Sequence, residues 1–433
     1  MTADTIYAPS TAIGGAIALI RVSGPLCPSI AQEMLDRDVT KTPRVLRFVR
    51  MLDGEQVLDD GMACFLPGQG TYTGEDMLEL SCHGGSRTVA RLLERLSRTG
   101  ARPAEPGEFT KRAFLNGKMD LSAAEAVMDV VSARAEESLK AALEQLHGKL
   151  FERISAVEDL LLDSLSAIDA AVDYPDEVEE DVSIALPESL NQAKQEIDAL
   201  IAEGRQGRVL REGVYVALVG RPNVGNSSLL NALIGMDRAI VTDLPGTTRD
   251  TLDEETSFFG VPVRLVDTAG IRESGDVVEQ IGIDRARAAL DRADVAVLLL
   301  DSTQALTEED RRLLTLTEGK TRLILRSKGD LLQGSDTFGE LTISAKTGEG
   351  LDELKRRIVT LSGAREGAAI TNERHIKALE NAREALRHAK NARELTLIAT
   401  DVRDALHHLG AITGRDVDAD VLDRIFSRFC VGK

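Results

Sequence analysis

The stretch Gly220-Arg221-Pro222-Asn223-Val224-Gly225-Asn226-Ser227-Ser228 decides the fold of the central part of this chain. It follows an apolar run, Val214–Val219, which predicts a buried strand, and precedes Leu229–Leu233, which predicts the opening of a helix. A glycine-bounded loop between a strand and a helix directs backbone N–H groups and the helix N-terminus towards a phosphate. The stretch therefore predicts a phosphate-binding loop.

Four further motifs follow this loop in the order and spacing that a GTPase requires. They are Asp243-Leu244-Pro245-Gly246-Thr247-Thr248-Arg249-Asp250, then Asp267-Thr268-Ala269-Gly270, Ser327-Lys328-Gly329-Asp330 and Ser344-Ala345-Lys346. The second motif follows the apolar run Val261–Val266, and the third follows Arg322–Leu325, so both stand at the ends of predicted strands. Five motifs in sequence predict a guanine-nucleotide-binding domain.

Each motif supplies a different part of the predicted site. Ser227 and Thr248 provide hydroxyls for Mg²⁺, and Asp267 holds the ion through water. Gly270 permits close approach of the backbone to the γ-phosphate, and Asp330 accepts from the N1 and N2 hydrogens of guanine. The predicted nucleotide-binding residues are Asn223, Val224, Gly225, Asn226, Ser227, Ser228, Thr242, Asp243, Leu244, Pro245, Gly246, Thr247, Thr248, Asp267, Thr268, Ala269, Gly270, Ser327, Lys328, Asp330, Ser344, Ala345 and Lys346.

The residue that orients the attacking water does not occupy its usual place. Ras-like enzymes use a glutamine directly after the Asp-x-x-Gly motif, and Ile271 stands there in this chain. The carboxylate that we choose instead is Glu279, in the following loop.

Asn226 stands where the pattern G-x-x-x-x-G-K-[ST] requires a lysine. Asparagine is neutral and too short to reach as far, so we expect weaker triphosphate binding and slower hydrolysis. Three explanations stay open: an introduced substitution, a natural variant with compensation, or a natural pseudo-GTPase. The intact motifs elsewhere favour the first. Ser327 replaces the usual asparagine of the guanine motif, which shortens one polar contact and matters less.

Composition narrows the class of protein. The chain has 433 residues, 43% of them hydrophobic, and a net charge of −19, which argues against a broad basic nucleic-acid surface but leaves room for a local patch or for tRNA recruited through a partner. Four cysteines without C-x-x-C spacing predict reduced thiols. The first residues lack the features of a signal peptide, and no apolar run is long enough to cross a membrane. We therefore expect a cytoplasmic protein.

Three kinds of sequence pattern divide the chain into four stretches. Residues 1–117 mix short strands, such as Ala16–Val22, with turns and a helix. Residues 118–212 have helical spacing, although the acidic stretch Asp173–Asp181 predicts a solvated loop or, less simply, a partner-binding patch. Residues 213–360 alternate strands and helices, and residues 361–433 are helical again. The predicted fold is an α/β P-loop GTPase domain inserted in an all-helical domain and preceded by an α+β domain.

Motifs outside the predicted GTPase domain carry a resemblance to a known family. They are Asp4-Thr5-Ile6, Ile20-Arg21-Val22-Ser23-Gly24, Tyr72-Thr73-Gly74-Glu75-Asp76, Cys82-His83-Gly84-Gly85, the run from Pro106 to Lys118 and the terminal Phe429-Cys430-Val431-Gly432-Lys433. Together they resemble the MnmE (TrmE) family of bacterial tRNA-uridine modification GTPases, over essentially the whole chain.

The resemblance implies a function beyond nucleotide binding. The N-terminal domain dimerises and binds a 5-formyl- or 5,10-methylene-tetrahydrofolate. Together with the flavoprotein MnmG (GidA), such a homodimer adds an aminomethyl or carboxymethylaminomethyl group at C5 of the wobble uridine of certain tRNAs. Carried over residue by residue, the folate contacts are Arg21, Glu79, Lys118 and Lys433. A carboxylate suits the amino-pyrimidine edge of a pterin, and cations suit the glutamate tail.

The resemblance also implies how the GTPase domains work. They pair across the dimer and use bound K⁺ in place of an arginine finger. Asn223 is the implied side-chain ligand of this ion, with backbone oxygens from Thr242 and Leu244 and a contribution from Thr247. Glu279 matches the family residue that orients the attacking water.

Two alternatives compete with this reading. One is an Era- or EngA-like ribosome-assembly GTPase, which should carry a basic RNA-binding module. The other is a nucleotide-binding scaffold without turnover, which is prompted by Asn226.

Overall fold

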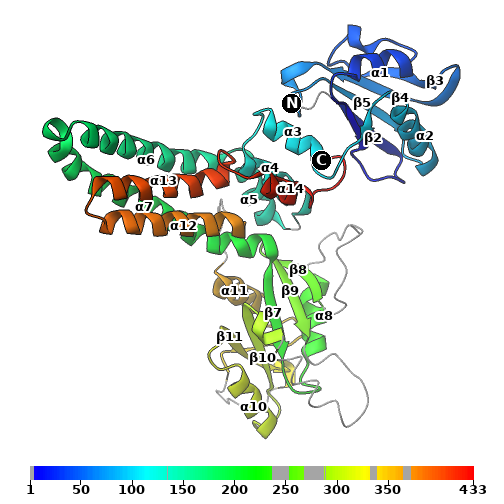
Figure 1. Ribbon diagram of the computed structural model, residues 1–433. Helices are drawn as coiled ribbons and strands as arrows, with labels where there is room; N and C mark the ends of the chain where they lie inside the picture. The colour runs from blue at the N-terminus through cyan, green and yellow to red at the C-terminus, as the bar shows by residue number, and fades with distance from the viewer. Residues whose placement is uncertain are drawn as a thin grey trace. The chain divides into compact units, whose positions relative to one another are not determined.

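A computed structural model describes residues 4–133, 135–236, 253–267, 287, 289–331, 339–363 and 372–433. The chain forms two compact units (Figure 1): residues 1–128 with 410–433, and residues 129–409. Each is described by itself below. In the described part of the chain, no helix combines the length and the apolar character needed to cross a membrane.

The first unit is built on a six-stranded sheet in the order β3-β4-β5-β2-β1-β6. All neighbouring strands are antiparallel except β1 and β6. The strands are β1 Ile6–Pro9, β2 Ile17–Ser23, β3 Arg47–Asp53, β4 Gln56–Leu66, β5 Met77–His83 and β6 Arg102–Pro103. One face packs against helices α1, Cys27–Met34, and α2, Ser86–Ser97, through a core that includes Ile20, Leu80 and Leu92.

Alternation along the strands gives this sheet two different faces. Ile20 and Val22 of β2 are fully buried under the helices, whereas Arg21 between them points to the opposite face and is half-buried. Helices α3, Glu108–Leu115, α4, Leu121–Ser132, and α14, Ala419–Phe426, complete the unit, together with two short 3₁₀ turns at 39–41 and 68–70. Phe426 and Phe429 near the chain end pack with Leu121, which anchors the C-terminus to this unit.

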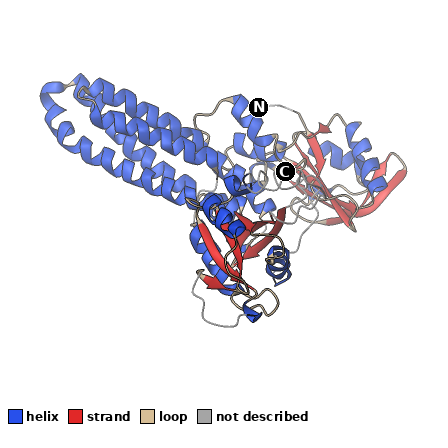
Figure 2. Cartoon of the chain, turned by 90° about the horizontal axis from the view of Figure 1, so that it is seen from below, coloured by secondary structure: helices blue, strands red, loops and turns tan. Residues whose placement is uncertain are grey.

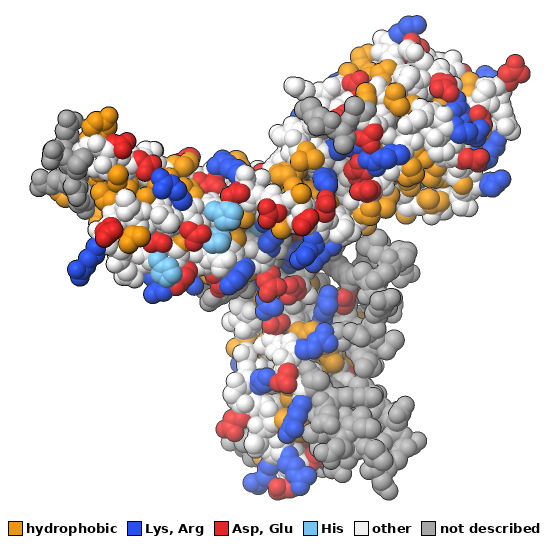
Figure 3. All heavy atoms as spheres, viewed as in Figure 1, with side chains coloured by type: hydrophobic (Ala, Val, Ile, Leu, Met, Phe, Trp, Pro, Cys, Tyr) orange, Lys and Arg blue, Asp and Glu red, His pale blue; other side chains and the backbone are white. Residues whose placement is uncertain are grey.

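In the helical part of the second unit, the long helices α6, α7, α12 and α13 lie side by side and the shorter α5 precedes them (Figures 1 and 2). They are α5 Glu136–Leu146, α6 Lys149–Asp173, α7 Pro175–Glu212, α12 Glu373–Asn391 and α13 Leu395–Thr413. Buried residues three or four apart, such as Ile154, Leu161 and Ile168 on α6, form the stripe expected of helices that pack on one side. Acidic and basic side chains are interspersed on the exposed surface of these helices (Figure 3).

The acidic stretch Asp173–Asp181 was wrongly predicted as a loop, because α7 begins at Pro175 and runs through it. Proline is favoured at the first position of a helix, where its missing N–H has no partner in any case. The break between α6 and α7 is confined to Tyr174.

The predicted GTPase domain is confirmed as an α/β sheet in the order β12-β11-β10-β7-β9-β8. Its strands are β7 Val214–Val219, β8 Asp253–Phe258, β9 Val261–Asp267, β10 Val295–Asp301, β11 Arg322–Ser327 and β12 Leu341–Thr342, and only β8 is antiparallel to its neighbour. Helices α8, Asn226–Met236, and α11, Leu351–Ser362, pack on one face, and α10, Glu308–Leu316, on the other. A 3₁₀ turn, Gly329–Leu331, follows β11.

This topology fixes where the motifs meet. In an open parallel sheet, ligands bind beyond the carboxyl ends of the strands, where the strand order reverses. The loop after β7, Asp267 at the end of β9, and the motifs after β11 and β12 all stand at that edge.

Candidate functional site

The phosphate loop has the backbone that its sequence requires. It runs from the end of β7 to the start of α8, and both Asn223 and Gly225 have positive φ, of 64° and 112°. A Cβ on Gly220 would lie 2.6 Å from Cγ1 of Val224, so a side chain there would force the loop open. The loop therefore closes tightly ahead of the N-terminus of α8, as an anion-binding loop does.

Asn226 lies folded beneath this loop. Its side chain is almost completely buried, and Nδ2 donates to the carbonyl oxygen of Gly220 over 3.4 Å. Its Oδ1 is buried with no hydrogen-bond partner in the described part of the chain. The position that requires a cation is thus filled by a neutral amide that is itself incompletely satisfied, which costs about 1–3 kcal/mol.

Ser227, at the start of α8, and Asp267, at the end of β9, are in direct contact. The Ser227 hydroxyl donates to Oδ2 of Asp267 over 2.8 Å, although the two residues are 40 positions apart in the chain. A hydroxyl and a carboxylate oxygen are ligands that suit Mg²⁺. The pair thus has the chemistry and the proximity that a magnesium site requires.

The guanine side of the site is held by two serines. Ser344, which is fully buried, donates to Oδ1 of Asp330 over 2.8 Å and so orients the carboxylate predicted to bind guanine. Ser327 is also buried, and its Oγ lies 2.7 Å from the carbonyl oxygen of Val224 in the phosphate loop. The sequence predicts only a shortened polar contact for Ser327, whereas in the structure this side chain bonds β11 to the phosphate loop.

Asp301, at the end of β10, was not singled out from the sequence. Its carboxylate accepts from Nζ of Lys328 over 2.7 Å and lies 3.7 Å from Nη2 of Arg221. Burial raises its pKa, but hydrogen bonds from Lys328 and Thr303 outweigh that effect and hold the pKa of Asp301 below its ordinary value. Its place directly after the apolar run Val295–Leu300 was the signal that could have revealed it.

The open face of the first unit's sheet carries a second cluster of charged and aromatic groups. Arg21 on β2 and Glu79 on β5 are cross-strand partners and form an ion pair of 3.0 Å. The Arg21 guanidinium also lies over the rings of Tyr72, at 5.4 Å, and Phe109, at 5.9 Å. Both charged side chains remain partly exposed, at 19% and 27%, so this pair is accessible to a ligand.

Comparison with known proteins gives the family. The family model of the MnmE helical domain matches residues 121–430, and that of the GTP-binding protein TrmE N-terminus matches residues 5–118. The tRNA modification GTPase MnmE of Natranaerobius thermophilus is 41% identical over 463 residues, which cover 100% of both chains. The chain belongs to the MnmE family of tRNA modification GTPases. As a member of this family, it is a GTP-hydrolysing enzyme.

A second curated relative agrees with this membership. The MnmE of Enterococcus faecalis is 41% identical over 460 residues, which cover 100% of this chain and 99% of that protein. A solved structure of Aquifex aeolicus Era bound to GDP and AlF₄⁻ matches 42% of this chain and 68% of its own, at 27% identity and a TM-score of 0.29. Membership in the MnmE family decides against the Era- or EngA-like alternative.

The remaining predicted folate residues also lie in the first unit. Lys118 donates through Nζ to the backbone oxygen of Gln69 over 2.6 Å, in the loop that leads to Tyr72. Lys433 ends the chain, and the residue before it lies against Pro9 at the end of β1. Arg21 and Glu79 are thus brought into direct contact, Lys118 lies on the loop that carries Tyr72, and Lys433 is at the chain end.

Several predicted nucleotide-site residues lie outside the described residues. These are Thr242, Asp243, Leu244, Pro245, Gly246, Thr247, Thr248, Thr268, Ala269, Gly270 and Glu279. Their predicted roles, and those of the other site residues, stay predictions, as do the domain boundaries at 117, 212 and 360.

Proposed function

We propose that this MnmE-family chain acts as a homodimer with an FAD-containing partner of the MnmG type. Together they add an aminomethyl or carboxymethylaminomethyl group at C5 of the wobble uridine in tRNA, using a tetrahydrofolate one-carbon unit. Family membership over the full length supports the proposal. The observation that carries it is the Arg21–Glu79 pair on an open sheet face, in the same chain as the Ser227–Asp267 and Ser344–Asp330 pairs.

The nucleotide site divides its work among a few residues. Ser227 and Thr248 hold Mg²⁺, which neutralises charge on the β- and γ-phosphates. Asp330, oriented by Ser344, accepts from guanine and selects GTP over ATP. Glu279 orients the attacking water. Compactness of the loop around Gly220 fixes the phosphate-binding N–H groups in place before the nucleotide arrives.

K⁺ is the second ion that the site is proposed to use. Asn223 contributes its side-chain oxygen, Thr242 and Leu244 contribute backbone oxygens, and Thr247 contributes a further contact. Asn223 is exposed and has a left-handed backbone. The ion supplies the positive charge that an arginine finger gives in other GTPases.

Tetrahydrofolate occupies the open sheet face in this proposal. Glu79 accepts from the amino-pyrimidine edge of the pterin, and Arg21 holds that carboxylate in place. The partly exposed ring of Tyr72 beside Arg21 gives the site a flat apolar surface of the kind that a pterin or its aminobenzoyl group contacts, whereas Phe109 is fully buried and only supports Arg21. Lys118 and Lys433 attract the glutamate tail. We place the protein in the cytoplasm, where its tRNA substrate is found.

A second function, nucleotide binding without turnover, is favoured by Asn226. The neutral amide gives no charge to the phosphates, and its buried Oδ1 has no hydrogen-bond donor among the described residues. Loss of one charge-stabilising group in a phosphoryl-transfer site costs on the order of 3 kcal/mol in the transition state. We therefore expect this chain to bind GTP more weakly, and to turn it over at least a hundredfold more slowly, than a version with lysine.

The decisive experiment compares Asn226→Lys with the unchanged chain and with Asn226→Gln, which lengthens the side chain without adding charge. GTP affinity and hydrolysis rate are measured in K⁺ and in Na⁺. We expect a large gain for Asn226→Lys in K⁺ and little for Asn226→Gln. Normal hydrolysis by the unchanged chain in K⁺ would show that the loss at Asn226 is compensated. No gain for Asn226→Lys would favour the binding protein without turnover.

A further inference from the structure

The last residues of the chain, 429–433, form a tail that is bonded to the first unit at two places. The backbone N–H of Gly107 donates to the carbonyl oxygen of Cys430 over 3.4 Å. The hydroxyl of Ser10 donates to the carbonyl oxygen of Gly432 over 3.1 Å. Within the tail, the backbone N–H of Lys433 donates to the carbonyl oxygen of Cys430 over 3.3 Å, which folds the last residue into a turn. The bond from Ser10 to Gly432 joins two residues that are 422 positions apart in the chain.

Gly432 allows this tie because it has no side chain. Its φ is +95°, and a Cβ built there would lie 2.2 Å from the carbonyl oxygen of Pro9. Any other residue at 432 would be strained and would push the tail away from β1. The backbone of the tail therefore lies directly against the last residue of β1.

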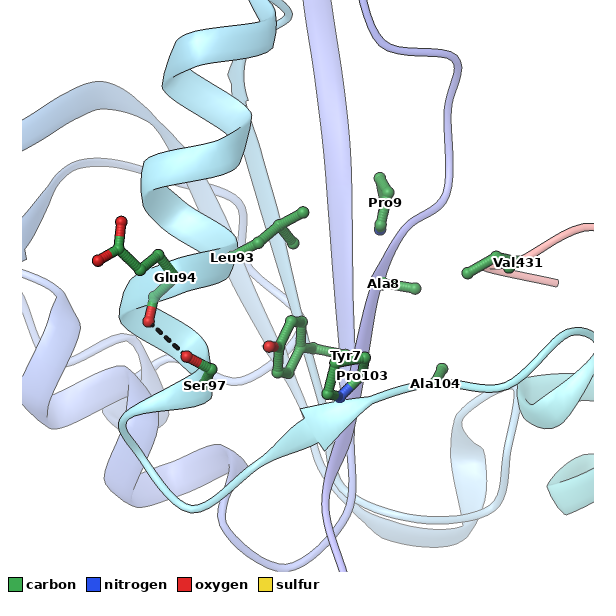
Figure 4. Close-up of a pocket in the computed structure, with 9 residues that line it drawn as sticks. All are labelled: Tyr7, Ala8, Pro9, Leu93, Glu94, Ser97, Pro103, Ala104 and Val431. Atoms are coloured by element: carbon green, nitrogen blue, oxygen red, sulfur yellow. Dashed lines mark hydrogen bonds between the residues drawn. The ribbon is translucent and has the colours of Figure 1, made fainter.

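Phe429 packs with Leu121 at the start of the tail, but apolar contacts alone do not fix the residues after it. Val431 lines a shallow pocket together with Pro9, Tyr7, Pro103 and, from α2, Leu93 (Figure 4). Half of Val431 remains exposed, at 50%, and this contact can slide because it has no direction. A hydrogen bond is directional, so the Ser10 hydroxyl sets where Gly432, and the residue after it, can lie.

The register of the sheet relates this point to the open face. Pro9 is the cross-strand partner of Ile20, and the preceding residue, Ala8, is the partner of Arg21. Arg21 is in turn the partner of Glu79. The tail thus contacts Pro9, and the residue before Pro9 in β1 is the cross-strand partner of Arg21.

We propose that Ser10 is a positioning residue for the tetrahydrofolate site: its bond to Gly432 holds Lys433 where its ammonium group meets the carboxylates of the ligand's glutamate tail. This inference rests on the folate-binding function proposed above. Ser10 does not touch the ligand. It acts by reducing the freedom of the chain end before binding, so its removal costs affinity without removing a charge.

The position of the chain end can be tested without any ligand. A carboxypeptidase that removes C-terminal lysine acts on an untagged chain that ends at Lys433, and mass spectrometry follows the release of that residue. We expect Ser10→Ala to release it about fivefold faster than the unchanged chain, as the loss of one neutral hydrogen bond implies. Ser10→Thr, which keeps the hydroxyl, should restore slow release.

Thr11→Ala is the matched control. Thr11 follows Ser10 in the loop after β1, and its hydroxyl accepts from the backbone N–H of Leu19 on β2 and not from the tail. Its removal should leave the release of Lys433 unchanged. Equal release from Ser10→Ala and the unchanged chain would overturn the inference.

Binding of tetrahydrofolate, measured by calorimetry, tests the role in the site. We expect Ser10→Ala to weaken binding about fivefold, and to have no further effect in a chain that lacks Lys433, because the two changes then act through one interaction. An equal loss in the chain without Lys433 would show that Ser10 acts in another way. GTP hydrolysis should be the same in Ser10→Ala and in the unchanged chain.

The two levels of the proposal fail differently. An unchanged chain that binds no tetrahydrofolate would overturn the folate function, and the role of Ser10 in it, even where Lys433 is released slowly. Equal tetrahydrofolate affinities for Ser10→Ala and the unchanged chain would overturn only the inference about Ser10.

Discussion

The hydroxyl of Ser327 lies 2.7 Å from the carbonyl oxygen of Val224, so the strand that leads to the guanine motif is bonded directly to the phosphate loop. The two residues are 103 positions apart in the chain and both are buried. Val224 is also the residue whose side chain fills the space beside Gly220. The Ser327 hydroxyl therefore connects the two halves of the nucleotide site.

Removing this hydroxyl should weaken nucleotide binding. In Ser327→Ala the Val224 carbonyl loses a buried partner, which costs about 1–3 kcal/mol and loosens the loop. We expect GDP affinity, measured by calorimetry, to fall about tenfold. Ser302→Ala is the control, because its hydroxyl bonds to the Lys328 carbonyl and not to the phosphate loop. Equal affinities for Ser327→Ala and the unchanged chain would contradict the structural role of Ser327.

Asp301 should make the stability of the second unit depend on pH in the acid range. Its folded pKa lies below the ordinary value of 3.8, mainly because the bonds from Lys328 and Thr303 outweigh burial. A carboxyl with a lowered pKa stabilises the fold above its unfolded pKa, and that contribution is lost as the pH falls through the folded pKa. The stabilisation is therefore complete above about pH 5 and declines below about pH 4.

Asp301→Asn tests this expectation. At pH 7 the variant loses the charged partner of Lys328, and we expect a loss of about 2 kcal/mol in the free energy of unfolding. The difference from the unchanged chain should shrink as the pH falls from 5 to 3. Urea unfolding followed by circular dichroism gives both values. A difference that does not change with pH would show that the charge of Asp301 contributes nothing.

Much of the α/β domain could be predicted because its central strands are buried on both faces. Such strands are continuous apolar runs bounded by turns, and the predicted strand at Val214–Val219 agrees with β7 residue by residue. The edge strand β8 was missed. Its sequence, Asp-Glu-Glu-Thr-Ser-Phe, is polar and gains its structure by antiparallel pairing with β9. Tertiary pairing overrides local preference there.

The contacts of the site were less predictable than its motifs. Motif spacing led to Ser227, Asp267 and Asp330, because each follows a recognisable strand. Spacing gives no information on which carbonyl Ser327 would meet, or that Lys328 would pair with Asp301 rather than with solvent. Such contacts depend on how neighbouring strands are ordered in the sheet.

Arg112 should be essential to the stability of the first unit. Its side chain is 5% exposed and bonds to three carboxylates, those of Asp4, Glu75 and Glu108. Arg112→Met leaves them without this cation, and we expect a loss of about 3 kcal/mol in the free energy of unfolding. Arg112→Lys should lose less, because it keeps the charge but not the planar fork.

Arg87→Met is the control for this change, because Arg87 is exposed on α2. It should alter the urea midpoint of unfolding little. A similar small change for Arg112→Met would mean that the buried pairs contribute no more than surface ones.

The turn between β8 and β9 forms the N-terminal cap of α5. The carbonyl oxygen of Gly260 accepts from the backbone N–H of Glu137 over 3.1 Å, in the first turn of a helix that has no side-chain cap. Both Phe259 and Gly260 have positive φ, of 50° and 80°. Because β9 ends at Asp267, the strand that carries a predicted magnesium residue is bonded at its other end to α5.

Gly260→Ala should therefore loosen α5. An alanine there is strained by the positive φ, and its Cβ would lie 3.3 Å from Cγ of Glu137. We expect faster hydrogen exchange in the first turn of α5, by about fivefold, as that bond weakens. Gly54→Ala is the matched control: Gly54 also has a positive φ, of 59°, but its Cβ would have no neighbour within 4 Å. Exchange of α5 that stays at the unchanged rate in Gly260→Ala would show that the hairpin turn does not hold the helix. Faster exchange in Gly260→Ala alone would establish the hairpin as the cap of α5, and as a physical connection between that helix and the strand of Asp267.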